Sequence, residues 1–301
     1  MLNRIIELMS DGLKVSANRG FLHVEKEGNV LANIPFNSIL SVMVTGHQIV
    51  YTDNLLRRLC EENIPLIILG KSYLPTGILY SFEGHFKQME IQHLQIEQKK
   101  PLYKKLWQTI IQEKIKNQSA VLSYFGKENP LRDIAKYVLS GDTDNKEGYA
   151  AKLYFKSLFG VNFVRNRELD GVNAFLNYGY AVLRSALARY VVASGLNPSY
   201  GINHHNKLNP FCLVDDLIEP FRPVVDKIVY QLYMERGCLD ELTRDDKAHF
   251  SALITTEFKT KEGHSPFYVI LQECVWDLVK SYKNQTPCFD FNPYLINDYL
   301  R

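Results

Sequence analysis

The sequence predicts an α+β fold, in which a small β-rich N-terminal domain precedes a larger, mostly α-helical domain. Short apolar runs rich in β-branched residues, separated by turn residues, dominate the chain up to about residue 82. From residue 101 onward, apolar residues recur at helical spacing. The polar stretch between them has little periodicity. We therefore divide the chain into a β-rich domain (1–82), a connector (83–100) and a helical domain (101–301).

The N-terminal domain is predicted to contain several strands and one helix. Gly20–Val24 and Val30–Ile34 flank a Gly28–Asn29 turn, which indicates a hairpin. Thr52 can cap the helix, which ends before Pro65. Further apolar, β-branched runs predict strands at Ile39–Val44, Ile64–Leu69 and Ile78–Phe82.

The second domain is predicted to be built from helices. Leu102–Leu122 has apolar residues at helical spacing, with charged residues on the other side. Asn145 or Asp144 can cap a helix that carries Glu147 in its first turn. Asn173–Ser194 forms a long helix that a glycine closes. The remaining elements are predicted to be a short strand at Thr255–Thr260 and helices at Val224–Met234 and Pro266–Lys283.

Composition and charge exclude several classes of protein. A chain of 301 residues with 46% hydrophobic and 23% charged residues is typical of a globular protein. A net charge of +2 is too small for a uniformly basic nucleic-acid binder, so any DNA contact must come from a local patch. Five scattered cysteines fit reduced thiols. Because we find no signal peptide and no apolar run long enough to cross a bilayer, we expect a cytoplasmic protein without membrane contact.

The segment Gly201–Pro223, GINHHNKLNPFCLVDDLIEPFRP, is the most informative part of the chain because it combines a histidine pair with several carboxylates. Imidazole nitrogens and carboxylate oxygens form the ligand set of a divalent ion such as Mn²⁺ or Mg²⁺. Asp216 and Glu219 stand at i and i+3, so both would emerge on one face of a helix. Upstream, Glu147–Phe155 (EGYAAKLYF) adds a further carboxylate.

Each of these residues also has a purely structural explanation when taken alone. Glu147 would favour the dipole of the helix in whose first turn it lies. Loop histidines are commonly solvated, and Arg222 suits an ion pair with a nearby carboxylate. The structural explanation is weakened because two distant segments each supply ligands that the other lacks.

The long helix carries a polar stripe. Asn173, Asn177, Tyr180 and Arg184 recur at i, i+4, i+7 and i+11 and therefore share one face. A helix in a core seldom needs such a stripe along its length. We expect these residues to support metal ligands or to contact phosphate.

Four segments together resemble a known family: EGYAAKLYF, NAFLNYGYAVLRSALAR, GINHHNK and DDLIEPFRP. They are similar to the CRISPR-associated spacer-acquisition integrases, in the variant from systems with a single large effector nuclease. The resemblance implies a homodimeric, metal-dependent DNA endonuclease and integrase. Such an enzyme inserts short foreign duplexes into a CRISPR array when a DNA 3′-hydroxyl attacks a phosphodiester. The implied partners are double-stranded DNA (spacer precursor and CRISPR repeat) and a small ferredoxin-like dimer, with the effector nuclease as a further candidate.

The resemblance also implies which residues form the site. Carried over residue by residue, the metal ligands and catalytic residues are Glu147, His204 and Glu219, and the ion is Mg²⁺ or Mn²⁺. The family spacing Gly-x-x-His favours His204, and the neighbouring His205 stays an alternative. Asp216, one turn before Glu219, is an auxiliary candidate. The basic residues expected to position DNA phosphate are Lys207, Arg184 and Arg222.

Two other functions are compatible with the same residues. The chain could be a stand-alone metal-dependent phosphodiesterase, which would hydrolyse DNA without joining it. It could also be a non-catalytic binder of branched DNA, which would bind equally well in EDTA. Because every ligand candidate lies beyond residue 140, the β-rich domain is expected to build the homodimer through its edge strands.

Overall fold

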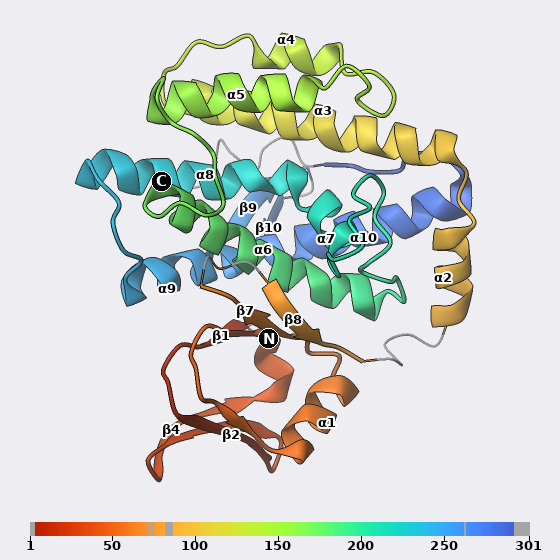
Figure 1. Ribbon diagram of the computed structural model, residues 1–301. Coiled ribbons are helices and arrows are strands. Elements are labelled where there is room, and N and C mark those ends of the chain that lie inside the picture. The colour runs from red at the N-terminus through yellow and green to blue at the C-terminus, as the bar shows by residue number, and fades with distance from the viewer. Residues whose placement is uncertain (1–3, 72, 74, 82–86, 262, 292–301) are drawn as a thin grey trace.

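The computed structural model describes residues 4–71, 73, 75–81, 87–261 and 263–291, and it confirms the predicted α+β class (Figure 1). Strands make up most of the N-terminal part, and helices make up most of the remainder. Within the described part of the chain, none of the helices combines the length and apolar character needed to cross a membrane.

The first N-terminal sheet faces the helices. Its four strands, in spatial order, are β1 (Arg4–Leu8), β5 (Ile39–Val44), β7 (Leu66–Leu69) and β8 (Pro75–Leu79). The first three run parallel, and β8 is antiparallel to β7. β5 is buried at every position, as expected for an apolar strand covered on both faces.

The second sheet lies farther from the helices and is largely antiparallel. Its four strands, in order, are β4 (Asn29–Pro35), β3 (Phe21–Lys26), β2 (Leu13–Asn18) and β6 (Val50–Tyr51). A small core that includes Val15, Leu22 and Val42 fills the space between the sheets. Helix α1 (Asp53–Glu61) closes this core with Leu55, and Thr52 caps it as predicted.

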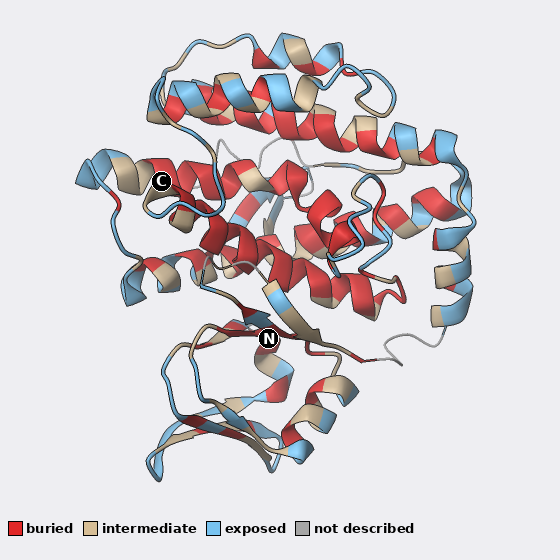
Figure 2. Cartoon of the chain, viewed as in Figure 1, coloured by how far each residue is buried: buried red, intermediate tan, exposed pale blue. Residues whose placement is uncertain are grey.

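The helical part surrounds α6 (Val172–Ala193), which is buried around most of its circumference (Figure 2). This burial identifies α6 as a central core helix. The other helices are α2 (Gln88–Ile96), α3 (Lys100–Tyr124), α4 (Leu131–Lys136), α5 (Lys146–Phe159), α7 (Cys212–Leu217), α8 (Arg222–Arg236), α9 (Arg244–Ala252) and α10 (Phe267–Asn284). The described residues also form short 3₁₀ turns at η1 (Phe36–Ser38), η2 (Glu219–Phe221) and η3 (Leu253–Thr255). Strand β9 (Glu257–Thr260) pairs with β10 (Gly263–Pro266).

The large core of the helical part extends into the first sheet. Leu40 and Met43 of β5 and Ile67 of β7 belong to the same apolar cluster as α3 and α6. Arg189 of α6 also donates to the backbone oxygens of β5. The apolar packing thus joins the first sheet to the helical part, and the domain boundary at residue 82 stays a prediction.

Several local predictions differ from the structure. The 83–100 segment was predicted to be a connector without regular structure, but it contains helix α2. This helix is held in place by a polar side chain. Gln95 of α2 donates to the carbonyls of Asn197 and Tyr200 and accepts from the amide of Asn197, so no apolar stripe marks the helix.

The predicted strand at 78–82 is β8, which begins earlier, at Pro75, and ends at Leu79; residue 82 lies outside the described residues. A proline is tolerated as the first residue of an edge strand. The predicted hairpin is present, but its turn residues are Glu27 and Gly28, with φ of 51° and 81°, so it lies one residue before the prediction. Strands β1 and β2 were not predicted.

Candidate active site

Glu147 is positioned by the start of α5. Asn145 caps this helix, as one of the two predicted caps, and accepts from the amide of Gly148 at 3.1 Å. The carboxylate of Asp142 accepts from the backbone amides of Lys146 and Glu147 at 2.8 and 3.0 Å. These bonds orient the first turn, where the Glu147 side chain remains partly exposed.

Glu219 lies in the 3₁₀ turn η2 between α7 and α8, where only 4% of the residue is exposed. The backbone leaves the α-helix after Leu217, and Pro220 follows in the tighter turn. Asp216 and Glu219 therefore have different partners, whereas the i, i+3 spacing predicted one shared face. Asn117 of α3 donates to the carbonyl of Pro220 at 2.8 Å and holds the turn in place.

Lys114 of α3 brings the two glutamates together. Its Nζ lies 2.6 Å from Oε1 of Glu147 and 2.6 Å from Oε2 of Glu219. On the other side of Glu219, Nε of Arg222 lies 3.0 Å from Oε1. The sequence predicted that the charged residues of α3 lie on its solvent-exposed side, but Lys114 is buried. The reason is that its ammonium pairs with two carboxylates from other segments.

The charges in this cluster support one another. Burial by itself would lower the pKa of Lys114, but the carboxylates of Glu219 and Glu147 outweigh this effect and raise it. Burial would raise the pKa of Glu219, but Arg222 and Lys114 together lower it. Both glutamate-binding cations therefore favour an ionised Glu219, although the side chain is almost completely removed from solvent.

His204 is held by Asp216. Its Nδ1 is hydrogen-bonded to Oδ1 of Asp216, and Oδ2 of the same carboxylate accepts from the amides of Ile202 and Asn203 at 2.5 and 2.9 Å. The hydrogen bond with Asp216 raises the pKa of His204. Trp107 of α3 contacts the imidazole edge-on, with ring centroids 5.7 Å apart. The Nε2 atom is thereby left as the nitrogen that can bind a ligand.

The glycine of the Gly-x-x-His spacing has a steric role. A Cβ at Gly201 would lie 2.3 Å from the carbonyl oxygen of His204 and 2.8 Å from Oδ2 of Asp216. The close wrapping of this loop around Asp216 therefore requires glycine. His205 is exposed on the same loop.

The donor set has the chemistry of a divalent-cation site. Glu147 and Glu219 direct oxygens at one cationic group, and Oε2 of Glu219 is buried without a well-aligned hydrogen bond, although the Lys114 ammonium is close. His204 is near enough to Glu219 for each to influence the other's pKa. Within the described ranges, however, no three His, Cys, Asp or Glu side chains converge closely enough to hold a metal ion as placed.

The predicted basic residues have different surroundings. Arg184 is buried and contacts Oδ1 of Asp215 through both Nε (2.7 Å) and NH2 (2.6 Å), so its guanidinium ties α6 to α7. Arg222 pairs with Glu219, and its guanidinium lies 4.6 Å from the ring centroid of Tyr180. Lys207 is exposed. Arg184 and Arg222 thus support the acidic residues, whereas Lys207 faces solvent.

A comparison with known families decides the classification. A profile described as CRISPR associated protein Cas1 matches residues 6–257. The chain belongs to the Cas1 family. It is 37% identical, over 260 residues, to a CRISPR-associated endonuclease Cas1 of Neisseria meningitidis, and the match covers 85% of each chain.

Solved structures share the Cas1 fold with this chain. A casposase bound to integration product superposes with a TM-score of 0.81 at 18% identity, covering 99% of this chain and 94% of that one. A CAS1 protein from Thermotoga maritima superposes with a TM-score of 0.75 at 18% identity, covering 95% and 99%. At these identities the likeness concerns the fold.

In this Cas1 chain, the polar stripe of α6 holds the loop between α5 and α6. Arg165 donates through NH1 to Asn173 (2.9 Å) and through NH2 to Asn177 (2.7 Å). Asn177 in turn donates to the carbonyl of Arg167 at 2.8 Å. Tyr180 instead hydrogen-bonds the buried Asp226. The loop that carries the arginines therefore explains the two asparagines of the stripe, whereas Tyr180 and Arg184 bind buried carboxylates.

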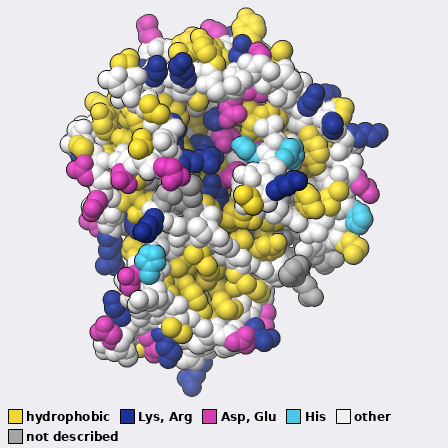
Figure 3. All heavy atoms as spheres, viewed as in Figure 1, with side chains coloured by type: hydrophobic (Ala, Val, Ile, Leu, Met, Phe, Trp, Pro, Cys, Tyr) yellow, Lys and Arg dark blue, Asp and Glu magenta, His cyan; other side chains and the backbone are white. Residues whose placement is uncertain are grey.

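Arg165 and Arg167 were not identified from the sequence. The signal available was the motif Arg-Asn-Arg, shortly before the asparagine stripe. Arg167 lies on this loop, and partial desolvation of its guanidinium together with the charge of Arg222 lowers its pKa. On the face shown in Figure 3, Lys and Arg side chains gather in a hollow beside Asp, Glu and His side chains, so both signs of charge meet there.

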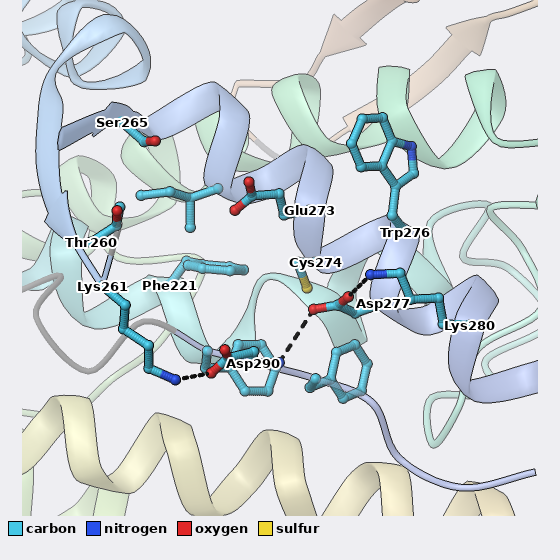
Figure 4. Close-up of a pocket in the computed structure, with 13 residues that line it drawn as sticks. Phe221, Thr260, Lys261, Ser265, Glu273, Cys274, Trp276, Asp277, Lys280 and Asp290 are labelled. Carbon is cyan, nitrogen blue, oxygen red and sulfur yellow. Dashed lines mark hydrogen bonds and ion pairs between the residues drawn. The ribbon is translucent and has the colours of Figure 1, made fainter. Parts of the chain in front are cut away.

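A cavity of about 340 Å³ lies between α10, the β9–β10 hairpin and residues 289–291 (Figure 4). Lys261 pairs with Asp290 at 2.6 Å, and Lys280 pairs with Asp277 at 2.9 Å. Phe221, two residues after Glu219, reaches its wall. Among the described residues, the predicted ligands do not line this cavity, so it is separate from the candidate site.

Proposed function

We propose that this Cas1 protein is a metal-dependent DNA endonuclease and integrase that inserts short foreign duplexes into a CRISPR array. The observation that carries the proposal is the meeting of Glu147 and Glu219 at one cationic group, with His204 held by Asp216 within electrostatic reach of Glu219. The printed names of the relatives, a CRISPR-associated endonuclease and a casposase bound to integration product, support the same class of reaction.

Glu147, His204 and Glu219 would hold Mg²⁺ or Mn²⁺. When bound, the ion supplies Lewis-acid stabilisation for the charge that develops on the phosphoryl oxygens. The protein needs no covalent nucleophile, because the attacking group is a DNA 3′-hydroxyl or, in hydrolysis, water. Asp216 keeps Nε2 of His204 available as a ligand atom, and Arg222 keeps the buried Glu219 ionised.

We propose a homodimer as the functional unit, built by the β-rich domain. Its edge strand β4 exposes two large apolar side chains, Val30 (53%) and Leu31 (57%), which a second copy could cover. The proposed partners are duplex DNA and a small ferredoxin-like dimer in the cytoplasm. A solved Cas6-RT-Cas1–Cas2 complex, with a TM-score of 0.77 at 16% identity, supports the second partner. Sedimentation of the full chain tests the dimer, and a monomer at micromolar concentration would refute it.

The proposed reaction is tested by strand transfer. Purified protein and the candidate partner are incubated with a labelled duplex and a plasmid that carries the repeat, in Mn²⁺, in Mg²⁺ or in EDTA. We expect joining that needs the metal and is lost in Glu147→Gln and Glu219→Gln, whereas the exposed-residue control Asp133→Asn joins normally. Hydrolysis without joining would identify a phosphodiesterase, and EDTA-insensitive binding without reaction would identify a DNA-binding scaffold.

A further inference from the structure

Lys114 has an unusual place for a lysine. It lies near the middle of α3, is only 8% exposed, and directs its ammonium between carboxylates from two other segments. Both N–O distances are 2.6 Å, at the short end of charge-assisted contacts. A lysine is seldom so completely buried unless it is paired.

The same face of α3 contacts three parts of the site. Trp107, Lys114 and Asn117 stand at i, i+7 and i+10, which places them along one side of the helix. Trp107 contacts the imidazole of His204, and Asn117 holds the turn that carries Glu219. Lys114 lies between them along the helix, so α3 delivers its ammonium to the centre of the candidate site.

The oxygens bound by Lys114 are the ones that the proposed metal needs. The Lys114 ammonium contacts Oε2 of Glu219, whereas Arg222 contacts the other oxygen, Oε1. A divalent ion on the same oxygens would face a full positive charge in a poorly solvated environment, where repulsion is strong. The ammonium and the metal ion therefore compete for one place.

We propose that Lys114 is an exchangeable counter-ion of the site: its ammonium neutralises Glu147 and Glu219 and leaves them when the metal ion binds. This inference rests on the proposed function, because it requires metal binding by these two glutamates. It explains how a site with a buried glutamate stays folded without its metal, and it makes Lys114 a residue that weakens metal affinity. Four carbons of flexible stem allow the ammonium to move away from the two carboxylates.

Metal affinity provides the direct test. Mn²⁺ binding to the full-length protein is measured by isothermal titration calorimetry for the wild type, Lys114→Met and Glu219→Gln. We expect Lys114→Met to bind Mn²⁺ at least threefold more tightly, and Glu219→Gln to lose binding. The matched control is Lys116→Met, which removes a charge two residues away on the same helix, where Lys116 is exposed and pairs with Glu113 at 3.3 Å. The control should bind like the wild type.

Thermal unfolding provides the second readout. In EDTA we expect Lys114→Met to melt several degrees below the wild type, because Glu219 loses one of its two cations. Saturating Mn²⁺ should raise the melting temperature of this variant more than that of the wild type. If Lys114→Met does not fold, the alternative measurement is the labelling of Lys114 in the wild-type protein with an amine-reactive ester. Mn²⁺ should increase this labelling several-fold.

The outcomes separate the two proposals. Unchanged or weaker Mn²⁺ affinity in Lys114→Met, together with lost binding in Glu219→Gln, would overturn the counter-ion exchange and leave the metal site standing. A stronger affinity in Lys116→Met of the same size would also overturn it, because the effect would then be general electrostatics. Mn²⁺ binding that is absent from the wild type, or indifferent to Glu219→Gln, would overturn the proposed metal site and the exchange with it.

Discussion

The carboxylate of Asp216 holds His204 twice, through Nδ1 of the imidazole and through the backbone amide of the same residue. Burial raises the pKa of the Asp216 carboxyl, and the hydrogen bonds from His204 and from the backbone of Asn203 and His204 oppose that shift. Asp216 is completely buried behind the histidine, so it acts on the candidate site through His204. Asp216, predicted as an auxiliary residue, orients His204 in this structure, and the role of His204 as a metal ligand stays a prediction.

Asp216→Asn should reduce metal-dependent joining by about 10- to 100-fold, because an amide orients the imidazole less strongly than a carboxylate. The pKa of His204 should also fall, since its largest cause is the hydrogen bond with Asp216. Joining rates and NMR titration of the imidazole measure the two effects. A variant with normal activity and an unchanged histidine titration would contradict this assignment.

His204→Ala should lose joining by orders of magnitude, whereas His205→Ala should stay within about twofold of the wild type. The physical reason is that His204 has a buried carboxylate and Trp107 to orient it, while His205 is exposed. The strand-transfer assay at saturating metal compares the pair. A larger loss at His205 would reverse the choice of ligand.

Glu219→Gln and Glu147→Gln should both abolish joining but differ in stability. Removing the charge of Glu219 leaves Lys114 and Arg222 buried with fewer partners, and we expect a loss of about 3 kcal/mol. Glu147 is partly exposed, so its loss should be about 1 kcal/mol or less. Urea denaturation in EDTA measures both. Equal losses would show that Glu219 is less dependent on its cations than its burial indicates.

Asp226 should make stability fall as pH rises. Burial raises its pKa from 3.8 to about 6, against the hydrogen bond from Tyr180. A carboxyl with a raised folded-state pKa contributes stability that is complete below pH 3.8 and is lost as pH rises through about 6. The shift corresponds to about 3 kcal/mol at most.

Asp226→Asn should remove this component. As pH rises from 4 to 7, the unfolding free energy of the wild type should therefore fall relative to that of the variant. Urea denaturation across this range measures it. Parallel curves for the two proteins would mean that Asp226 ionises normally in the folded protein.

Lys207→Ala should weaken DNA binding for all sequences and reduce the salt slope by about 1, because an exposed lysine that contacts phosphate releases one counter-ion. Arg184→Ala should act differently and cost stability, since it leaves Asp215 buried without its guanidinium. Fluorescence anisotropy at several salt concentrations and urea denaturation separate the two. An unchanged salt slope would show that Lys207 is merely solvated.

Short-range patterns in the sequence determined the class of fold and the position of many elements. Thr52 and Asn145 cap the helices they were predicted to cap, because a capping side chain bonds an amide only a few residues away. The long helix predicted at 173–194, with a glycine closing it, is α6. The acidic and histidine candidates were likewise predicted from neighbouring residues and from a family resemblance.

Only the tertiary structure revealed what surrounds those candidates. The sequence predicted charged residues on the exposed side of the helix that carries Lys114, but α3 packs against the starts of α5 and η2, where the Lys114 ammonium pairs with two carboxylates. Gln95 belonged to the predicted polar connector, but its side chain bonds the loop after α6. Asn173 and Asn177 were expected to support metal ligands or to contact phosphate, but in the structure their side chains accept hydrogen bonds from Arg165. In each case the partner lies in a different segment, and a buried polar side chain leaves no periodic apolar signal of its own. Local sequence therefore specified which side chains are available, and long-range packing decided which charges face one another.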